Sequence, residues 1–174
     1  MKRGCWWVGS SPFHLGHLHA VKYALKHVKC LVIVVGSAQY SHSLRNPFTA
    51  GERITMIRGA LSEEGIPPSR YLIIPVPDTN GDHAVWVSRV KQYTPKFDVV
   101  FTNDPLTGRL FKEAGYRVIP VPLLERGVYS GTEVRRRILR GENWEELVPS
   151  FVARYIAEMG GVKRIREIAG LATE

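Results

Sequence analysis

The sequence has few cysteines and no long hydrophobic run. Only two cysteines, Cys5 and Cys30, occur among 174 residues, and no Cys/His spacing is typical of a zinc site. Both border apolar runs, so we expect two buried free thiols rather than a disulfide. No apolar stretch is long enough to span a bilayer, and the one near the N-terminus is too short for a signal peptide. These absences predict a cytoplasmic protein that has no membrane partner and binds no metal through its own side chains.

Acidic residues are also in short supply. The chain carries 24 Lys and Arg against 16 Asp and Glu, for a net charge of +8. This balance favours an anionic partner such as a nucleotide, a nucleic acid or a phosphorylated metabolite. The basic residues are spread along the chain apart from Arg135-Arg136-Arg137, and no nucleic-acid-binding module is recognisable. We therefore expect a small phosphorylated partner and no nucleic acid.

Apolar runs alternate with amphipathic segments over the first two thirds of the chain. The runs are rich in Val, Ile and aromatic residues and predict buried strands at 5–8, 31–35, 71–76, 98–101 and 116–121. The segments between them predict helices at 16–28, 49–64, 85–93 and 105–114. From about residue 122 the pattern is helical, at 134–140, 143–147, 150–158 and 162–169. We expect one α/β domain over 1–174, a doubly wound parallel sheet with a helical C-terminal portion.

Two histidines follow the first predicted strand. His14 and His17 open a helix after the turn that begins at Gly9 and Ser10, and their spacing puts both imidazoles on one face of its first turn. A helix start also offers unpaired backbone N–H groups and the positive end of the helix dipole, which favours phosphate. The alternative is that one histidine is a core or capping residue. A nucleophilic role is less favoured, because no nearby carboxylate in the sequence would orient either ring.

A second candidate phosphate-binding segment opens a helix near the C-terminus. Ser130, Gly131 and Thr132 can present hydroxyl and backbone N–H groups, and Ser130-Gly131-Thr132-Glu133 has the spacing of a capping box, as does Thr49-Ala50-Gly51-Glu52. The three arginines that follow lie about 100° apart around a helix, so they cannot all reach one ligand.

Two loops offer weaker signals. Gly36 and Gln39 follow the second predicted strand and Arg45 comes soon after, which suits a ligand-lining loop or an ordinary surface loop. Asp78 follows the third strand, and Trp86 opens the next helix. Trp86 either stacks on a flat ligand ring or belongs to the core.

The motifs His14-Leu15-Gly16-His17 and Ser130-Gly131-Thr132-Glu133-Val134-Arg135, in that order, resemble those of the nucleotidylyltransferase superfamily. The runs 36–39, 46–53, 86–88, 129–137 and 161–165 look more narrowly like the archaeal-type nicotinamide-mononucleotide adenylyltransferases. The resemblance implies a Rossmann-like nucleotidylyltransferase fold and the reaction of ATP with nicotinamide mononucleotide to give NAD and pyrophosphate, with magnesium. It also implies a homo-oligomer, a hexamer.

The resemblance also assigns roles to residues. It implies that His14, His17 and Arg136 are catalytic contacts to the ATP phosphates. The other residues that it implies at the nucleotides are Gly9, Ser10, Gly36, Gln39, Arg45, Asp78, His83, Trp86, Ser130, Thr132 and Arg135.

The chain departs from the family in two places. The turn Gly9-Ser10-Ser11-Pro12 lacks the family's phosphate-binding arginine, and His83 stands where the family has an asparagine before the tryptophan. Three interpretations stay open: an adenylyltransferase for nicotinamide mononucleotide, one for another acceptor such as nicotinic acid mononucleotide or phosphopantetheine, and an NAD- or ATP-binding protein whose catalysis is reduced or lost.

Overall fold

The computed structural model describes residues 2–9, 11–125 and 127–172. Of residues 171 and 172 it describes the backbone alone. In these residues five strands form one sheet: β1 (Arg3–Val8), β2 (Cys30–Val35), β3 (Tyr71–Pro75), β4 (Val99–Phe101) and β5 (Arg117–Ile119). Every pairing between neighbouring strands is parallel. The five predicted strands and the parallel sheet are therefore confirmed.

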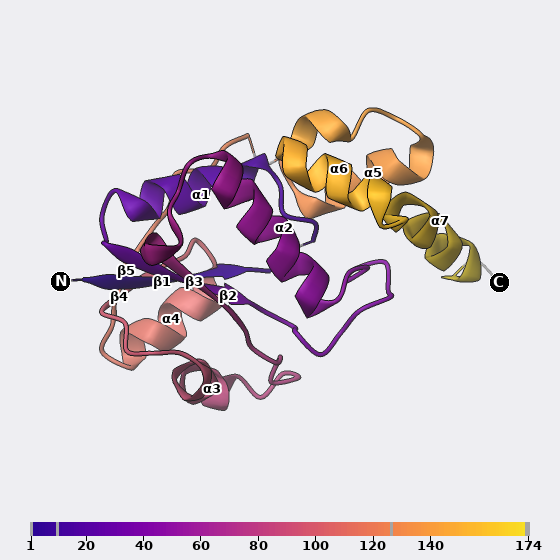
Figure 1. Cartoon of the computed structure of the whole chain (residues 1–174). Coiled ribbons are helices and arrows are strands. Elements are labelled where there is room, and N and C mark those ends of the chain that lie inside the picture. The colour runs from indigo at the N-terminus through magenta and orange to yellow at the C-terminus, as the bar shows by residue number, and fades with distance from the viewer. Residues whose placement is uncertain (1, 10, 126, 173–174) are drawn as a thin grey trace. The chain divides into compact units, whose positions relative to one another are not determined.

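The strand order is β3-β2-β1-β4-β5, so the chain runs outward from β1 in one direction and then in the other (Figure 1). β1 pairs with β2 from Arg3 opposite Cys30 to Val8 opposite Val35, and with β4 from Gly4 opposite Val99. Ligands of open parallel sheets bind beyond the carboxyl ends of the strands, where the order switches. Here that point follows Val8, directly before the turn that leads to the histidine pair.

Helices separate the strands as the sequence predicts. They are α1 (Leu15–Leu25), α2 (Ala50–Glu63), α3 (Trp86–Tyr93), α4 (Pro105–Glu113), α5 (Gly131–Arg140), α6 (Ser150–Glu158) and α7 (Gly161–Ala172). Short 3-10 turns occur at Pro68–Arg70, His83–Val85 and Glu145–Leu147. The helix expected at 143–147 is such a turn, because Trp144, Glu145 and Val148 close it with bonds three residues apart.

The chain divides into two compact units whose segments alternate along the sequence. The first unit comprises Met1–Gly9, Ala20–Gln39 and Pro67–Pro122, and the second comprises Ser10–His19, Tyr40–Ile66 and Leu123–Glu174. The prediction of one domain over 1–174 stays a prediction.

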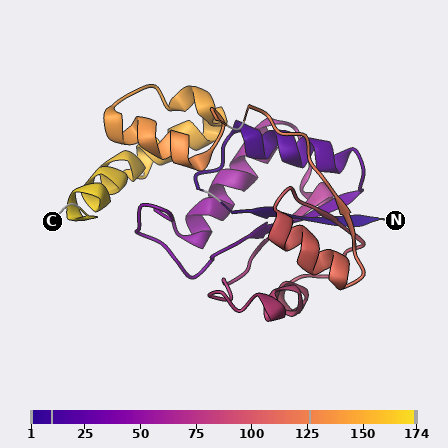
Figure 2. The same cartoon turned by 180° about the vertical axis from the view of Figure 1, so that it is seen from behind.

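The first unit is the sheet with helices on both faces. α3 and α4 lie side by side on one face, and the C-terminal part of α1 lies on the other (Figures 1 and 2). A cluster of buried side chains joins the sheet to α3 and α4, among them Cys5, Val100, Val90 and Phe111. Both cysteines are free, Cys5 buried and Cys30 half-buried, and burial raises the pKa of the Cys5 thiol.

The second unit holds α2, α5, α6, α7 and the start of α1. Gly59 of α2 lets α6 approach closely, because a Cβ there would lie 2.1 Å from the ring of Phe151. The predicted capping box of α2 is confirmed: Thr49 Oγ1 accepts from the backbone N–H of Glu52, and the Glu52 carboxylate accepts from that of Thr49.

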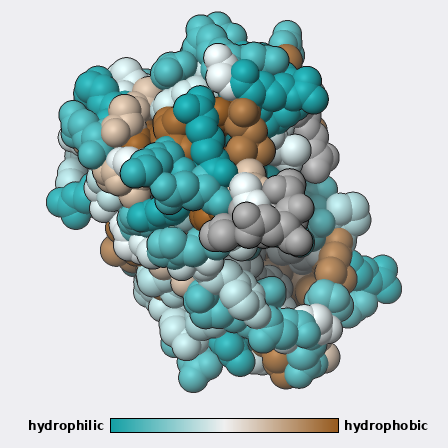
Figure 3. All heavy atoms as spheres, turned by 90° about the vertical axis from the view of Figure 1, so that its right-hand side faces the viewer, coloured by the Kyte–Doolittle hydropathy of each residue, from teal (hydrophilic) through white to brown (hydrophobic). Residues whose placement is uncertain are grey.

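On the face drawn in Figure 3 most side chains are hydrophilic, and hydrophobic ones form small separate groups. Among the described residues, no helix has the length and apolar character needed to cross a membrane.

Candidate active site

The start of α1 is closed by its two histidines. The His14 carbonyl accepts the first helical hydrogen bond from Leu18 at 3.1 Å, which makes His14 the N-cap. Its Nδ1 accepts from the backbone N–H groups of Gly16 at 3.0 Å and His17 at 3.3 Å. His17 reciprocates, because its Nδ1 accepts from the backbone N–H of His14 at 3.2 Å. The arrangement is a capping box in which imidazoles replace the usual hydroxyl and carboxylate.

This reciprocal cap fixes the protonation of both rings. A backbone N–H can only donate, so each Nδ1 must be unprotonated. A neutral imidazole then carries its proton on Nε2, which makes each ring a hydrogen-bond donor at that atom. Both residues are buried, and their rings stack with centroids 3.6 Å apart. Two neutral N–H donors are thereby held at a helix start.

Gly16 is required by the same geometry. A Cβ at this position would lie 2.8 Å from Cε1 of His14 and 3.3 Å from the carbonyl oxygen of Tyr129. Contacts shorter than 3 Å to a ring that is itself hydrogen-bonded leave no room for a side chain. The close approach also puts Tyr129, which precedes α5, beside the first turn of α1.

The surroundings keep both rings neutral. Burial lowers the pKa of His14 to about 4. The pKa of His17 falls well below its usual value, first through burial and then through repulsion from His14 and Arg53. Arg53 is itself only 3% exposed, and burial lowers its pKa to about 10. Near neutral pH the histidines therefore donate as uncharged groups and the arginine supplies the charge.

Arg135 of α5 reaches the turn before the histidines. Its Nη1 donates to the carbonyl oxygen of Ser11 at 2.6 Å, and its Nη2 lies 3.5 Å from Oγ1 of Thr132. Ser130 is the N-cap of α5, since its Oγ accepts from the backbone N–H of Glu133 at 3.1 Å. The starts of α1 and α5 therefore meet around Ser11 and Tyr129.

Arg45 adds a second cation to this region. Burial first, and then the charge of Arg45, lower the pKa of Arg135. Among the described residues neither arginine forms an ion pair with a carboxylate. Two neighbouring cations without a carboxylate, beside two helix starts, can bind a polyanion.

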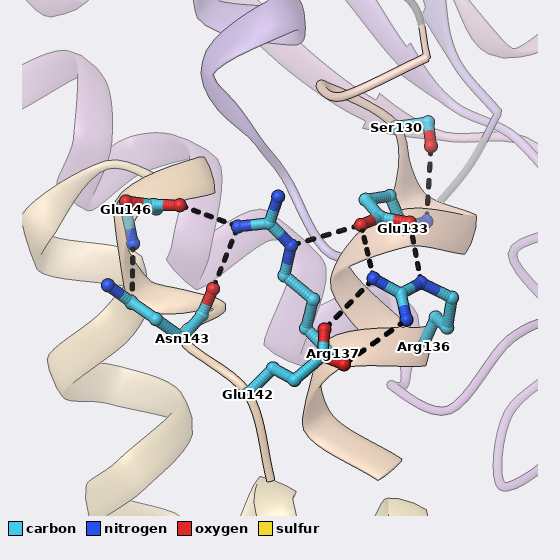
Figure 4. A network of polar contacts seen from close by, with 7 residues as sticks. All are labelled: Ser130, Glu133, Arg136, Arg137, Glu142, Asn143 and Glu146. Carbon is cyan, nitrogen blue, oxygen red and sulfur yellow. Dashed lines mark hydrogen bonds and ion pairs between the residues drawn. The ribbon is translucent and has the colours of Figure 1, made fainter. Parts of the chain in front are cut away.

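Arg136 and Arg137 face a different set of partners (Figure 4). Arg136 donates to both oxygens of Glu133 at 2.8 Å and to Glu142 at 2.9 Å. Arg137 donates to Glu133 at 3.0 Å and to Glu146 at 2.6 Å. These hydrogen bonds lower the pKa of Glu133 to about 2. The capping box expected at 130–133 is therefore only half formed, because the Glu133 carboxylate turns to the two arginines.

A second group of the residues expected at the nucleotides lies in the first unit. Gln39 does not present its amide freely: Oε1 accepts from the backbone N–H of Asp78 at 2.8 Å, and Nε2 donates to its carbonyl oxygen at 3.1 Å. Trp86 is half-buried and its ring centroid lies 6.4 Å from that of Trp7. His83 is exposed at the start of a 3-10 turn. Two tryptophans and the Asp78 turn thus lie at the carboxyl end of the sheet.

The structure groups the expected site residues in two sets. His14, His17, Arg45, Ser130, Thr132 and Arg135 belong to the second unit, and Gly9, Gly36, Gln39, Asp78, His83 and Trp86 belong to the first. Arg136 belongs to the second unit but is held by carboxylates. Ser10 lies outside the described residues.

Sequence reasoning missed three residues near these sets. Arg53 is buried beside His17, Ser11 is 1% exposed next to Arg135, and Trp7 contacts Trp86. Arg53 could have been found, because it shares the buried helical face of Met56, Ile57 and Ala60. Nothing in the local sequence marks Ser11 or Trp7 in the same way.

Within the residues that the structure describes, no group of three or more His, Cys, Asp and Glu side chains is placed to hold an ion. Magnesium is bound in many nucleotide enzymes by the substrate's phosphates and few protein groups. The donor set here, imidazole N–H and guanidinium, suits the phosphates rather than the cation.

Comparisons with known proteins agree with this chemistry. A model of the cytidylyltransferase-like family matches residues 11–137. The nicotinamide-nucleotide adenylyltransferase of Saccharolobus solfataricus is 49% identical over 170 residues, which cover 98% of this chain and 98% of the relative. The enzyme of that name from Archaeoglobus fulgidus is 50% identical over 163 residues, which cover 91% of this chain and 92% of the relative.

Solved structures share the fold. A bifunctional NMN adenylyltransferase/ADP ribose pyrophosphatase from Francisella tularensis, complexed with AMP and a manganese ion, gives a TM-score of 0.81 at 20% identity. The similarity covers 97% of this chain and 52% of that protein, so the chain spans about half of its length. At this identity the likeness concerns the fold alone.

Proposed function

The chain belongs to the cytidylyltransferase-like family and to its nicotinamide-nucleotide adenylyltransferases, and from that membership we propose that it transfers the adenylyl group of ATP to nicotinamide mononucleotide. The products are NAD and pyrophosphate. The observation that carries the proposal is the set of uncharged N–H donors at the start of α1, together with Arg135 and Arg45, which form no ion pair with a carboxylate among the described residues.

The reaction needs no protein nucleophile. An oxygen of the mononucleotide's 5′-phosphate attacks the α-phosphorus of ATP and forms the new P–O bond. The bond between the α-phosphorus and the bridging oxygen to the β-phosphate breaks, and pyrophosphate leaves with those electrons. The attacking phosphate is already ionised near neutral pH, so catalysis consists of positioning and stabilising charge on the phosphates.

The residues of the second unit suit that task. We assign the Nε2–H groups of His14 and His17 to the ATP phosphates, where charge builds up as pyrophosphate leaves. Arg135 and Arg45 supply the positive charge, and Ser130 and Thr132 line the triphosphate. Arg135 takes the part that the family resemblance assigned to Arg136, since Glu133 and Glu142 already hold Arg136.

Magnesium enters this proposal as part of the substrate, MgATP. The phosphates hold the ion, and it neutralises charge on the leaving pyrophosphate. The arginines and imidazoles bind phosphate oxygens that the ion leaves available.

The acceptor lies with the first unit in this proposal. The flat ring of Trp86 stacks on the pyridine, and Asp78 and His83 line its 3-substituent. Gln39 holds the Asp78 backbone rather than the ligand. Gly9 and Gly36 lie beside the nucleotides without side chains that would crowd them.

Arg135 can substitute for the arginine that the family has in the turn before His14 and that this chain lacks. Its guanidinium donates to Ser11 within that turn, so a cation is present there although the turn has no arginine of its own. This contact favours an active enzyme over a protein that only binds NAD or ATP. The homohexamer stays a prediction of the family resemblance, and the cytoplasmic location stays a prediction of the sequence composition.

The test is an assay of NAD formation by the purified chain from MgATP and nicotinamide mononucleotide. Nicotinic acid mononucleotide and phosphopantetheine serve as alternative acceptors in parallel reactions. We expect equimolar NAD and pyrophosphate, and no transfer to phosphopantetheine. Transfer to phosphopantetheine alone, or binding of ATP without transfer to any acceptor, would contradict the proposal.

A further inference from the structure

The segment 161–165 at the start of α7 is one of the runs that resemble the family. None of its residues has a role in the proposed reaction. Arg164 in this segment contacts the chain that connects Arg45 to α2. Its Nη1 and Nη2 donate to the two carboxylate oxygens of Glu52 at 2.7 and 3.0 Å, and its Nη1 also lies 3.3 Å from the carbonyl oxygen of Pro47. One guanidinium therefore bridges both ends of the stretch 47–52.

The same stretch is packed against α7 through Phe48. Phe48 is fully buried, and the guanidinium carbon of Arg164 lies 5.9 Å from the centroid of its ring. A Cβ at Gly161 would lie 3.0 Å from Cε1 of Phe48, so glycine allows α7 to begin against this ring. Two residues of α7 thus fix the position of Phe48.

Glu52 links this contact to the start of α2. Its carboxylate accepts from the backbone N–H of Thr49 at 2.8 Å as well as from Arg164. The side chains of Arg164 and Glu52 are 23% and 18% exposed, so solvent screens the pair only partly. A bidentate arginine–carboxylate pair also fixes direction as well as distance.

Arg45 lies just before the clamped stretch. The turn that carries it is closed by Ser43, whose backbone N–H donates to the Asn46 carbonyl at 3.2 Å and whose Oγ accepts from the Asn46 N–H at 3.1 Å. Asn46 is buried and continues directly into Pro47. Arg45 itself is exposed, so its direction is set by the backbone on either side rather than by packing of its own side chain.

We propose that Arg164 is a positioning residue for ATP, which through Glu52, Pro47 and Phe48 holds the Arg45 turn where its guanidinium meets the triphosphate. The proposal rests on the function proposed above, because it takes Arg45 as a phosphate contact. Arg164 touches no substrate and acts only through the stretch 47–52.

The test compares steady-state kinetics of the full chain with Arg164→Met, Arg45→Ala and the double variant. We expect Arg164→Met to raise KM for ATP about tenfold with little change in KM for the mononucleotide. In the Arg45→Ala background the same substitution adds little, because its effect passes through Arg45. Arg164→Lys keeps the charge but not the two parallel hydrogen bonds. We expect its KM for ATP to lie between that of the parent chain and that of Arg164→Met.

The matched control is Arg154→Met. Arg154 of α6 pairs with Glu63 at the other end of α2, so this variant also breaks an ion pair between α2 and the C-terminal helices. It is expected to leave both KM values unchanged. If Arg164→Met does not fold, Glu52→Gln serves instead, since glutamine keeps the capping box and removes the charge that Arg164 meets.

The outcomes separate the two proposals. If Arg45→Ala leaves KM for ATP unchanged, the assignment of Arg45 in the proposed function is wrong. If Arg45→Ala raises that KM while Arg164→Met (or Glu52→Gln) does not, or if the two effects multiply fully, the positioning role of Arg164 is overturned and the proposed function stands.

Discussion

His14 and His17 each accept a hydrogen bond from the other's backbone N–H through Nδ1, with their rings stacked 3.6 Å apart. The two residues that bind phosphate in the proposed reaction therefore also begin the helix that carries them. Function and local stability depend on the same protonation state, because an imidazolium has no acceptor at Nδ1.

Acid is expected to destabilise the protein through this pair. The pKa of His14 is about 4 in the folded chain against 6.5 ordinarily, so the unfolded chain binds more protons between these values. The free energy of unfolding therefore falls as the pH drops from 7 towards 4, by up to ~3 kcal/mol from His14. Urea denaturation across this range measures it, with His14→Ser as the control. If the free energy of unfolding of His14→Ser falls as steeply with pH as that of the parent chain, groups other than His14 cause the effect.

Substitutions of His17 can separate capping from catalysis. His17→Ala loses both the Nε2–H donor and the acceptor for the His14 backbone, whereas His17→Gln can keep an acceptor at this helix position. We expect both variants to lose at least ~100-fold in kcat, and His17→Ala to lose ~1 kcal/mol more in stability. Rates and melting temperatures are compared together. Full activity in His17→Gln would mean that the imidazole serves only as a cap.

The arginine triplet gives a matched pair of variants. Arg135→Met is expected to lower kcat/KM for ATP by ~100-fold or more, because it removes the cation that reaches the turn before His14. Arg136→Met breaks the solvent-screened ion pairs with Glu133 and Glu142 and is expected to change stability and activity little. A larger kinetic defect in Arg136→Met than in Arg135→Met would reverse our assignment.

Gly16 is predicted to tolerate no side chain. In Gly16→Ala the new Cβ meets the His14 ring at 2.8 Å, which should destabilise the protein by ~1–3 kcal/mol and displace the ring from the phosphates. Gly51→Ala in α2 is the control, since a Cβ there finds its nearest atom at 3.9 Å. That variant should be as stable as the parent or up to ~1 kcal/mol more stable. Thermal denaturation and NAD formation report both effects.

Trp86 tests the acceptor side. Trp86→Ala should raise KM for the mononucleotide about tenfold and leave KM for ATP nearly unchanged, while Trp86→Phe retains part of the stacking. Quenching of tryptophan fluorescence by nicotinamide mononucleotide gives an independent readout. Equal effects on both KM values would indicate a role in the core, where Trp86 also packs.

Much of the fold follows from the sequence because continuous Val- and Ile-rich runs leave few alternatives to buried parallel strands. The Thr49 capping box was equally readable, since both of its partners lie within one turn. The histidine spacing predicts a shared face but not that each ring would accept from the other's backbone. That outcome depends on the ring orientations in the folded turn.

The contacts of the arginine triplet, Arg135 to Arg137, could be predicted only in part from the sequence. Helical geometry predicts that the three side chains diverge, but it cannot say which one faces the first turn. Glu133 decides this by holding Arg136 and Arg137 together with Glu142 and Glu146. The partner of Arg135, Ser11, lies 124 positions away in the sequence, so no local pattern reveals it.

In the proposed reaction the histidine pair works as two neutral Nε2–H donors. Nitrogen-15 NMR of the imidazoles in the full chain, recorded at neutral pH with and without MgATP, tests this most directly. We expect His14 and His17 both to have an unprotonated Nδ1 and a protonated Nε2, and ATP to shift the Nε2 resonances. An imidazolium, or a proton on Nδ1 of either ring, would contradict it.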